Sequence, residues 1–159
     1  MPGRVHPYVV HFGAALLLTA VLLFLLGTLF RHRSWAASLL TAARWNLWLG
    51  AACALAAIGT GFLDYTSARC DAATIDATIL HRRAGAVTWW SSLIAGIAAW
   101  RTRHRAPGPL LLGWLLVVGL AAGTATVLGS KLTYERGLGV DAATPGAAPL
   151  CFEAERARR

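Results

Sequence analysis

The chain has 159 residues, of which 57% are hydrophobic and only 14% are charged. This balance is too apolar for a water-soluble domain of this length and is typical of an integral membrane protein. The net charge of +8 would favour nucleic-acid binding in a soluble protein, but here the cations lie between the apolar stretches and in the tail, so we expect no nucleic-acid partner.

Four apolar stretches approach or exceed the length of about 20 residues that a membrane-spanning helix needs. The first is followed by arginines and lacks a basic start and a small-residue cleavage site, so we interpret it as a retained helix and not a signal peptide. The sequence therefore predicts an all-α fold, an integral membrane four-helix up-and-down bundle within residues 1–136. The predicted spans cover roughly residues 8–30, 46–63, 84–100 and 109–129.

Arginines without acids mark two of the three connections. Arg31, Arg33 and Arg44 lie between the first two stretches, and Arg101, Arg103 and Arg105 lie between the last two. Cytoplasmic connections are enriched in arginine and lysine, so we predict that these two turns are cytoplasmic and that both termini lie on the outer side. All seven acids then fall on the outer side, although cations also lie near helix ends there and the cation bias itself is small.

Residues 137–159 are rich in glycine, proline and alanine, and we expect an extended periplasmic C-terminal tail. Cys70 and Cys151 both fall on the predicted outer side, where an oxidising compartment permits a disulfide; the alternative is two separate thiols, because spacing does not fix connectivity. Small residues in the second and fourth stretches predict that these two helices pack closely.

One end of the predicted bundle gathers most of the residues that can carry chemistry. Antiparallel helices place the starts of the first and third helices and the ends of the second and fourth at the same level. His32 and His104 lie in the opposite turns and are expected to be solvated. The residues at the shared level are His6, His11, Asp64, His81, Arg82, Arg83 and Tyr134.

His11 and His81 are the predicted axial ligands of a haem iron. They begin diagonal helices, and an ionisable ring at membrane depth needs a partner in the interior of the bundle. No C-x-x-C-H attachment motif occurs, so the haem would be of b type. Gly13, Gly61, Gly85 and Gly129 would leave room for the macrocycle. Tyr134 belongs to the predicted binding set, and Arg82, Arg83 or Arg4 would pair with the propionates.

Two alternatives remain open for the histidines. His6, His11 and His81 together would suit copper or zinc, whereas without a cofactor the rings would serve in structural hydrogen bonds or in a proton or quinone site. Asp64 lies near the end of the second helix. It is either a charge partner of Arg82 or Arg83, or a carboxylate that orients a ligating imidazole through the other ring nitrogen.

These residues resemble the bacterial membrane-protein family catalogued as domain of unknown function 2231. The family shows HP-x-x-x-HF at its start and G-x-x-L-x-Y-x-x-G-x-G-V at its close, and this chain has HPYVVHF and GSKLTYERGLGV, with GFLD and a histidine between them. Arg136 stands where many relatives have a histidine. The likeness covers about residues 6–140, and its motif positions include His6, His11, Asp64, His81, Tyr134 and the Gly137/Gly139 turn.

The resemblance implies a bacterial inner-membrane protein with four helices, often encoded near respiratory or c-type cytochrome genes. The resemblance does not supply an activity; from the histidine level we expect a multi-pass, N-out/C-out, b-type haem electron-transfer protein or subunit of a respiratory redox complex. It would pass electrons between quinone or other membrane subunits and a periplasmic c-type cytochrome. The alternatives are a cofactor-free scaffold or assembly subunit and a periplasm-facing copper or zinc handling protein. No nucleophile–base constellation occurs, so we do not expect a stand-alone enzyme. With a haem, the chain would instead serve as a subunit of an oxidoreductase complex.

Overall fold

The computed structural model describes residues 5–138 and 149–158, and the secondary structure in these ranges is helical apart from one isolated β-bridge between Arg69 and Leu150. The all-α prediction is confirmed. The helices are α1 (Val5–Leu29), α2 (Ala36–Ser67), α3 (Ala72–Arg101), α4 (Pro109–Tyr134) and α5 (Cys151–Arg156).

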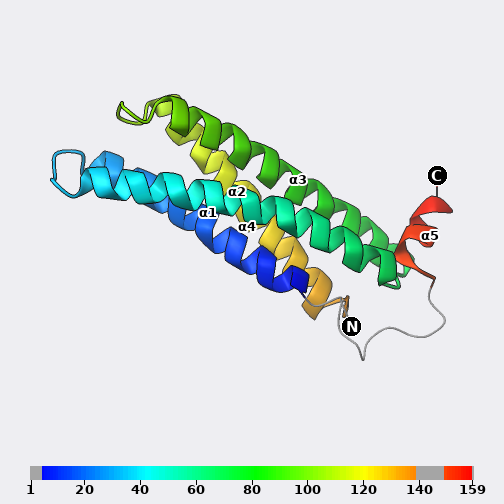
Figure 1. Ribbon diagram of the computed structural model, residues 1–159. Helices are drawn as coiled ribbons and strands as arrows, with labels where there is room; N and C mark the ends of the chain where they lie inside the picture. The colour runs from blue at the N-terminus through cyan, green and yellow to red at the C-terminus, as the bar shows by residue number, and fades with distance from the viewer. Residues whose placement is uncertain (1–4, 139–148, 159) are drawn as a thin grey trace.

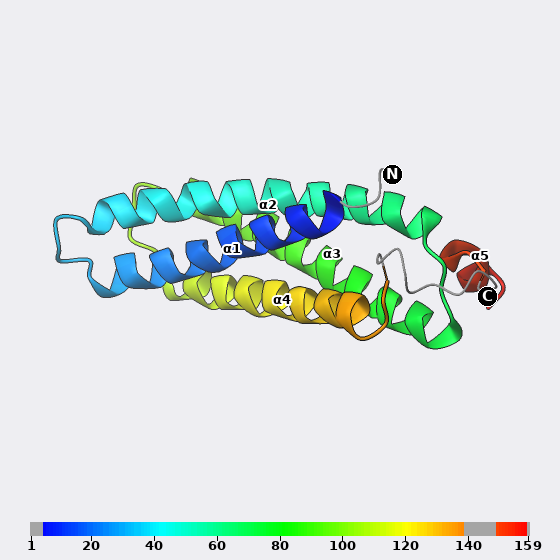
Figure 2. The ribbon, with the colours of Figure 1, turned by 90° about the horizontal axis from the view of Figure 1, so that it is seen from below.

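The four long helices lie side by side, and consecutive helices run in opposite directions (Figure 1). α1 packs on α2 and α4, and α3 packs on the same two helices, so α1 and α3 are diagonal. Figure 2 shows the start of α1, the end of α4 and the short α5 toward one end, while the α1–α2 and α3–α4 connections lie at the other. This arrangement brings the starts of α1 and α3 and the ends of α2 and α4 toward the same end of the molecule, as expected.

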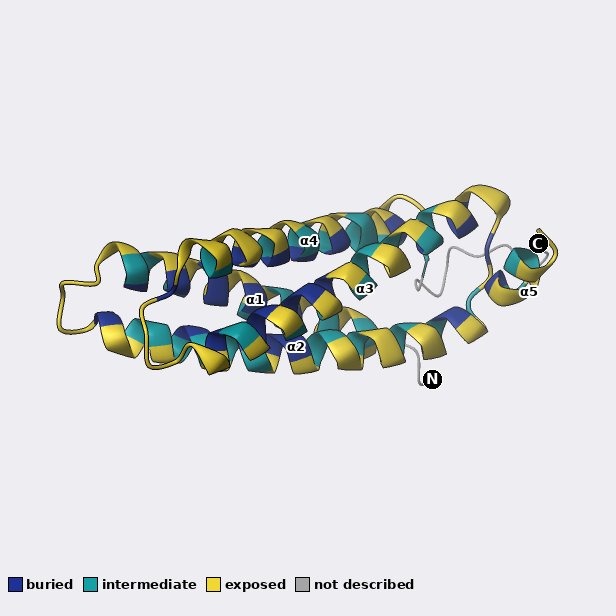
Figure 3. Cartoon of the chain, turned by 90° about the horizontal axis from the view of Figure 1, so that it is seen from above, coloured by how far each residue is buried: buried dark blue, intermediate teal, exposed yellow. Residues whose placement is uncertain are grey.

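Three of the long helices, α1, α2 and α4, are long and apolar enough to cross a membrane. Their outward faces are largely exposed (Figure 3), with Leu110 at 90% and Leu120 at 73% exposure. Lipid is the solvent that suits such a surface. α3 is less apolar because it carries hydroxyl side chains such as Ser91 and Ser92, which are buried and donate to carbonyls of their own helix. A crossing by α3 and the outer placement of both termini stay predictions.

The helices continue beyond the apolar stretches that predicted them. α2 begins at Ala36 and α3 at Ala72, well before the predicted 46 and 84. Asp71 caps α3 by accepting a hydrogen bond of 2.8 Å from the Thr74 amide. The Thr74 side chain and amide both hydrogen-bond the Asp71 carboxylate and lower its pKa. Hydropathy marks only the part of a helix that suits lipid, whereas at α3 the Asp71 cap marks where the helix begins.

The predicted close packing of the second and fourth helices is wrong, because α2 and α4 are diagonal partners. Small residues of α2 instead allow α1 to pack closely against it. A Cβ added to Gly50 would lie 2.7 Å from Leu17 Cδ2, and one added to Gly13 of α1 would lie 3.0 Å from Cys53 Cβ. The small residues therefore allow close packing between helices that follow each other in the chain. The apolar core between the four helices includes the fully buried Leu17, Phe24, Leu47, Leu115 and Val118.

The C-terminal tail differs from the extended strap that was expected, because residues 151–156 form α5. A six-residue helix is not stable alone. A disulfide joins its first residue, Cys151, to Cys70 between α2 and α3, and the Arg69–Leu150 bridge holds the preceding backbone. Residues 139–148, which include Gly139 of the predicted turn, lie outside the described residues, as does Arg4.

Candidate functional site

His6 and His81 face each other across the diagonal of the four helices. Their ring centroids are 6.3 Å apart and their planes are inclined at 84°. His6 lies in the first turn of α1, and His81 lies ten residues into α3, at the level where α1 begins. Both rings are half-buried between the helices. Two diagonal helices thus bring one imidazole each to a common point.

A hydrogen bond orients each ring, and the one at His81 also fixes which nitrogen carries the hydrogen. His81 Nδ1 lies 3.0 Å from the Ala125 carbonyl oxygen, which can only accept, so Nδ1 donates. His6 Nδ1 lies 3.1 Å from Thr60 Oγ1, and that hydroxyl also lies 3.0 Å from the Ala56 carbonyl oxygen. Either His6 Nδ1 or the rotatable Thr60 hydroxyl can be the donor of this bond. His81 Nε2 keeps a lone pair, which is the form of histidine that binds a metal ion, and His6 Nε2 keeps one in the tautomer in which Nδ1 donates.

A glycine on the neighbouring helix supports each ring. A Cβ added to Gly61 of α2 would lie 2.8 Å from His6 Cε1, and one added to Gly129 of α4 would lie 2.9 Å from His81 Cε1. The α1–α2 and α3–α4 pairs therefore build the same feature: a histidine on the first helix lies on a glycine of the second. The sequence carries a matching signal, because alanine precedes each glycine by four residues, at Ala57 and Ala125.

Replacing Gly61 with alanine tests whether this glycine supports the His6 ring. The new methyl group must displace the His6 ring, and overpacking of this kind costs about 1–3 kcal/mol. Gly59 lies on the same helix, and a Cβ there meets nothing within 4 Å. We expect Gly61→Ala to lower the free energy of unfolding in detergent, while Gly59→Ala leaves it unchanged or raises it. Equal effects of the two variants would contradict the role of Gly61 as a support for the ring.

His11 does not meet His81. It is exposed, and its Nδ1 lies 2.6 Å from the Pro7 carbonyl oxygen of its own helix. The expectation that the His11 and His81 rings face each other differs from what the structure shows, and the reason is helical geometry. Five residues along an α-helix turn the side chain by about 140° at 3.6 residues per turn. Since His6 points into the helices, His11 points away from them.

The remaining predicted site residues lie around the pair without contacting it directly. Arg82 pairs with Glu155 at 3.0 Å, and its guanidinium lies 5.0 Å from the centre of the Tyr65 ring. Tyr134 is 83% exposed. Asp64 makes neither of the predicted contacts in the described residues: Arg82 pairs with Glu155, and the imidazoles are oriented by Thr60 and Ala125.

A cleft of about 1730 Å³ surrounds the histidine pair, larger than the roughly 300–1,000 Å³ of a typical small-molecule pocket. Its walls come from all four long helices and from α5. His6 and His81 share it with His11, Asp64, Arg82, Arg83 and Tyr134. Apart from Arg4, which lies outside the described residues, the site residues predicted from the sequence therefore line one cleft, although only two of them face each other.

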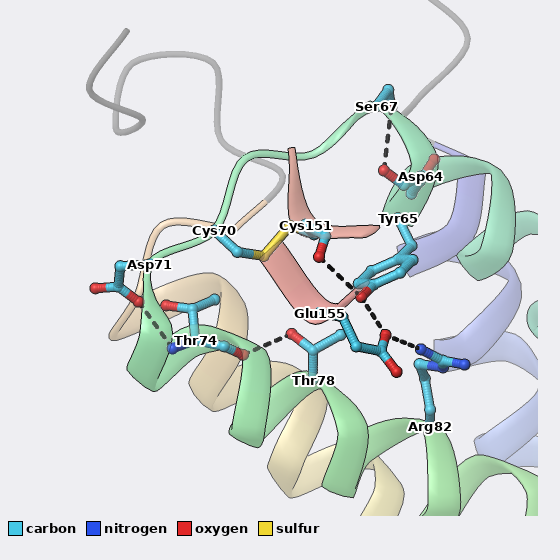
Figure 4. The surroundings of a disulfide bond; sticks show 10 residues. All are labelled: Asp64, Tyr65, Ser67, Cys70, Asp71, Thr74, Thr78, Arg82, Cys151 and Glu155. Atoms are coloured by element: carbon cyan, nitrogen blue, oxygen red, sulfur yellow. Dashed lines mark hydrogen bonds and ion pairs between the residues drawn. A yellow bond between two sulfur atoms is a disulfide. The ribbon is translucent and has the colours of Figure 1, made fainter. Parts of the chain in front are cut away.

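The α5 segment lies beside the end of α2 and the start of α3 (Figure 4), and its Glu155 lines one side of this cleft. Tyr65 donates its hydroxyl to the Cys151 carbonyl and to the Glu155 carboxylate, which also accepts from Arg82. Arg158 pairs with Asp76 at 2.8 Å. Sequence reasoning did not find this network, because its partners are more than 70 residues apart and no local spacing signals them.

Comparison with known proteins gives one clear result. The family described as "Predicted membrane protein (DUF2231)" matches residues 3–142, which includes the histidine pair, both glycines and all four long helices. No curated protein and no solved structure matches the chain. With three helices apolar enough to span a bilayer, the chain is a multi-pass membrane protein, and it belongs to the DUF2231 family of predicted membrane proteins.

Proposed function

We propose that this protein is a membrane-embedded b-type haem electron-transfer protein, or the haem-bearing subunit of a respiratory redox complex, with His6 and His81 as the axial ligands. The observation that carries the proposal is the pair of half-buried imidazoles that diagonal helices bring to one point. Two imidazoles that share one metal ion, with metal–nitrogen bonds of about 2.0–2.1 Å, have ring centres roughly 6 Å apart. The observed separation is 6.3 Å.

The donor set favours haem over a small metal ion. Zinc and copper sites in proteins use three or four side-chain ligands. Within residues 5–138 and 149–158, no group of three or more histidine, cysteine, aspartate or glutamate side chains lies close enough to hold a metal ion. A haem iron needs only two ligands from the chain because the macrocycle supplies the rest. The glycines under both rings also keep the neighbouring helix surface free of side chains.

When bound, a haem would supply reversible one-electron transfer. The chain's own residues would hold and insulate it. Thr60 and the Ala125 carbonyl orient the two rings, and the carbonyl also fixes the tautomer of His81. Arg83, which lines the cleft, is the cation best placed to meet a propionate, since Arg82 already pairs with Glu155.

The proposal includes an orientation in the bacterial inner membrane with both termini in the periplasm. The Cys70–Cys151 disulfide supports it, because disulfides persist in the periplasm and are rare in the cytoplasm. The arginines in the opposite connections support it as well. The haem would then lie near the periplasmic face, within reach of a c-type cytochrome. Because one haem cannot span about 30 Å of hydrocarbon, quinone or another membrane subunit would have to exchange electrons on the same side.

Absorption spectra of the purified, full-length protein in detergent test the proposal. We expect a sharp α band of b type on reduction with dithionite, and a pyridine haemochrome assay that gives about one haem per chain. A featureless spectrum with bound copper or zinc by metal analysis would favour a metal-handling protein. A featureless spectrum without metal would favour the cofactor-free scaffold.

A further inference from the structure

We propose that the end of the molecule opposite the histidine pair is a binding surface for anionic phospholipid headgroups. This surface, called the arginine end below, consists of residues 30–35 and 101–108. The proposal does not depend on haem binding, so it can be contradicted without affecting the proposed function. Its arginines are Arg31, Arg33, Arg101, Arg103 and Arg105, all exposed.

No ion pair within residues 5–138 and 149–158 neutralises the positive charge of the arginine end. No acidic residue occurs anywhere in residues 1–63 or 77–134. The ion pairs seen among the described residues, such as Arg82–Glu155, lie at the opposite end. Arg103 stacks 4.7 Å above the Trp100 ring and donates to its carbonyl, contacts that leave the charge in place. The surface is therefore open to an anion.

Helix ends add to this attraction. α2 and α4 both begin at the arginine end, neither has a side-chain cap, and neither has an acid in its first turn. The helix dipole gives such a terminus a partial positive charge, although the Ala36 and Ser38 amides at the start of α2 already bond to preceding carbonyls. Two uncapped helix starts thus reinforce the arginines between them.

The position of the arginine end identifies the anion. Trp35, Trp100 and Trp114 are exposed around it, and tryptophan collects at the level of lipid headgroups. Leu110, one residue into α4, is 90% exposed, so the apolar surface begins directly beside the arginines. Phosphates of membrane lipids lie at that boundary, and clusters of four to eight basic residues there bind anionic lipid.

One buried polar atom at the same end points to an acceptor from outside the chain. Arg44 lies about two turns into α2, and its Nε is buried with no hydrogen-bond partner in the part of the chain that the structure describes. Its long side chain can extend along the helix toward the interface. A phosphate oxygen would satisfy both its charge and its unpaired N–H.

The test is the binding of phosphatidylglycerol and phosphatidylcholine with identical acyl chains to the full-length protein in neutral detergent, measured by native mass spectrometry. We expect a preference for phosphatidylglycerol that falls more than about tenfold in the triple variant Arg101→Gln/Arg103→Gln/Arg105→Gln, since each arginine near an anionic surface contributes several-fold. The matched control removes three cations from the other end: Lys131→Gln/Arg136→Gln/Arg156→Gln should keep the preference.

Several results would overturn the proposal. Equal binding of the two lipids, or an equal loss in the control variant, would show that the arginine end is not the site. Thermal stabilisation by inorganic phosphate as large as that by phosphatidylglycerol would indicate a site for free anions. A salt titration of the unmutated protein needs no variant to fold: the preference must weaken between about 50 and about 500 mM salt, and an unchanged preference would also contradict an electrostatic surface.

Discussion

Replacing His6 or His81 with alanine is expected to abolish the b-type spectrum, whereas the same replacement at His11 should leave it intact. The proposal takes one axial ligand from each of the two rings, so the loss of either leaves an incomplete pair of ligands. Loss of a hydrogen bond behind a metal ligand already costs about 10–100-fold in affinity, so removal of the ligand should cost at least that much. His11 points away from the pair and bonds to its own helix.

The measurement is the haem content and the reduced-minus-oxidised spectrum of each purified variant, with circular dichroism to show that the helices remain. His11→Ala is a matched control because it makes the same change on the same helix. Loss of haem in His11→Ala with retention in His6→Ala would assign the ligand to His11, as the sequence alone predicted. Full retention of haem in both His6→Ala and His81→Ala would contradict the proposal that these residues are the axial ligands.

The features that local sequence patterns control were predictable. Apolar stretches located α1 and α4 within a few residues, and antiparallel connection placed the site residues at one end. The choice between His6 and His11 depended on the rotation of α1 about its own axis. Its apolar residues cover almost the whole circumference, as membrane helices do, so no hydrophobic face indicates how the helix is oriented. The glycine under His6 could be recognised only once α2 was in place.

Contacts between distant parts of the chain were the least predictable. Tyr65, Glu155 and Arg82 come from three different elements, and nothing in their spacing indicates that they meet. The cysteines allowed a disulfide, but only the approach of the tail to the α2–α3 connection decides that it forms. The same contact explains why Cys151–Arg156 is helical in a tail whose composition favours an extended chain.

Removal of the Cys70–Cys151 disulfide should produce the largest loss of stability in this molecule. The cysteines are separated by 81 residues, and a closed loop of that length is worth about 4–5 kcal/mol from the entropy of the unfolded chain, with native disulfides usually measured at about 2–5 kcal/mol. Both sulfurs are buried in the small apolar cluster that also contains Tyr65 and Ile75. We expect Cys151→Ser to release α5, because six residues cannot hold a helix unaided.

Unfolding in detergent and hydrogen exchange of residues 149–158 measure this effect together. Cys70→Ser, Cys151→Ser and the double variant should lose the same free energy, since each removes one and the same bond. Cys53→Ala is the control, because Cys53 is the free cysteine of the described residues. Thiol labelling of the denatured chain should find one reactive cysteine before reduction and three after it. Three labelled thiols before reduction, or unchanged exchange in Cys151→Ser, would show that the tail is held by the Tyr65–Glu155–Arg82 contacts alone.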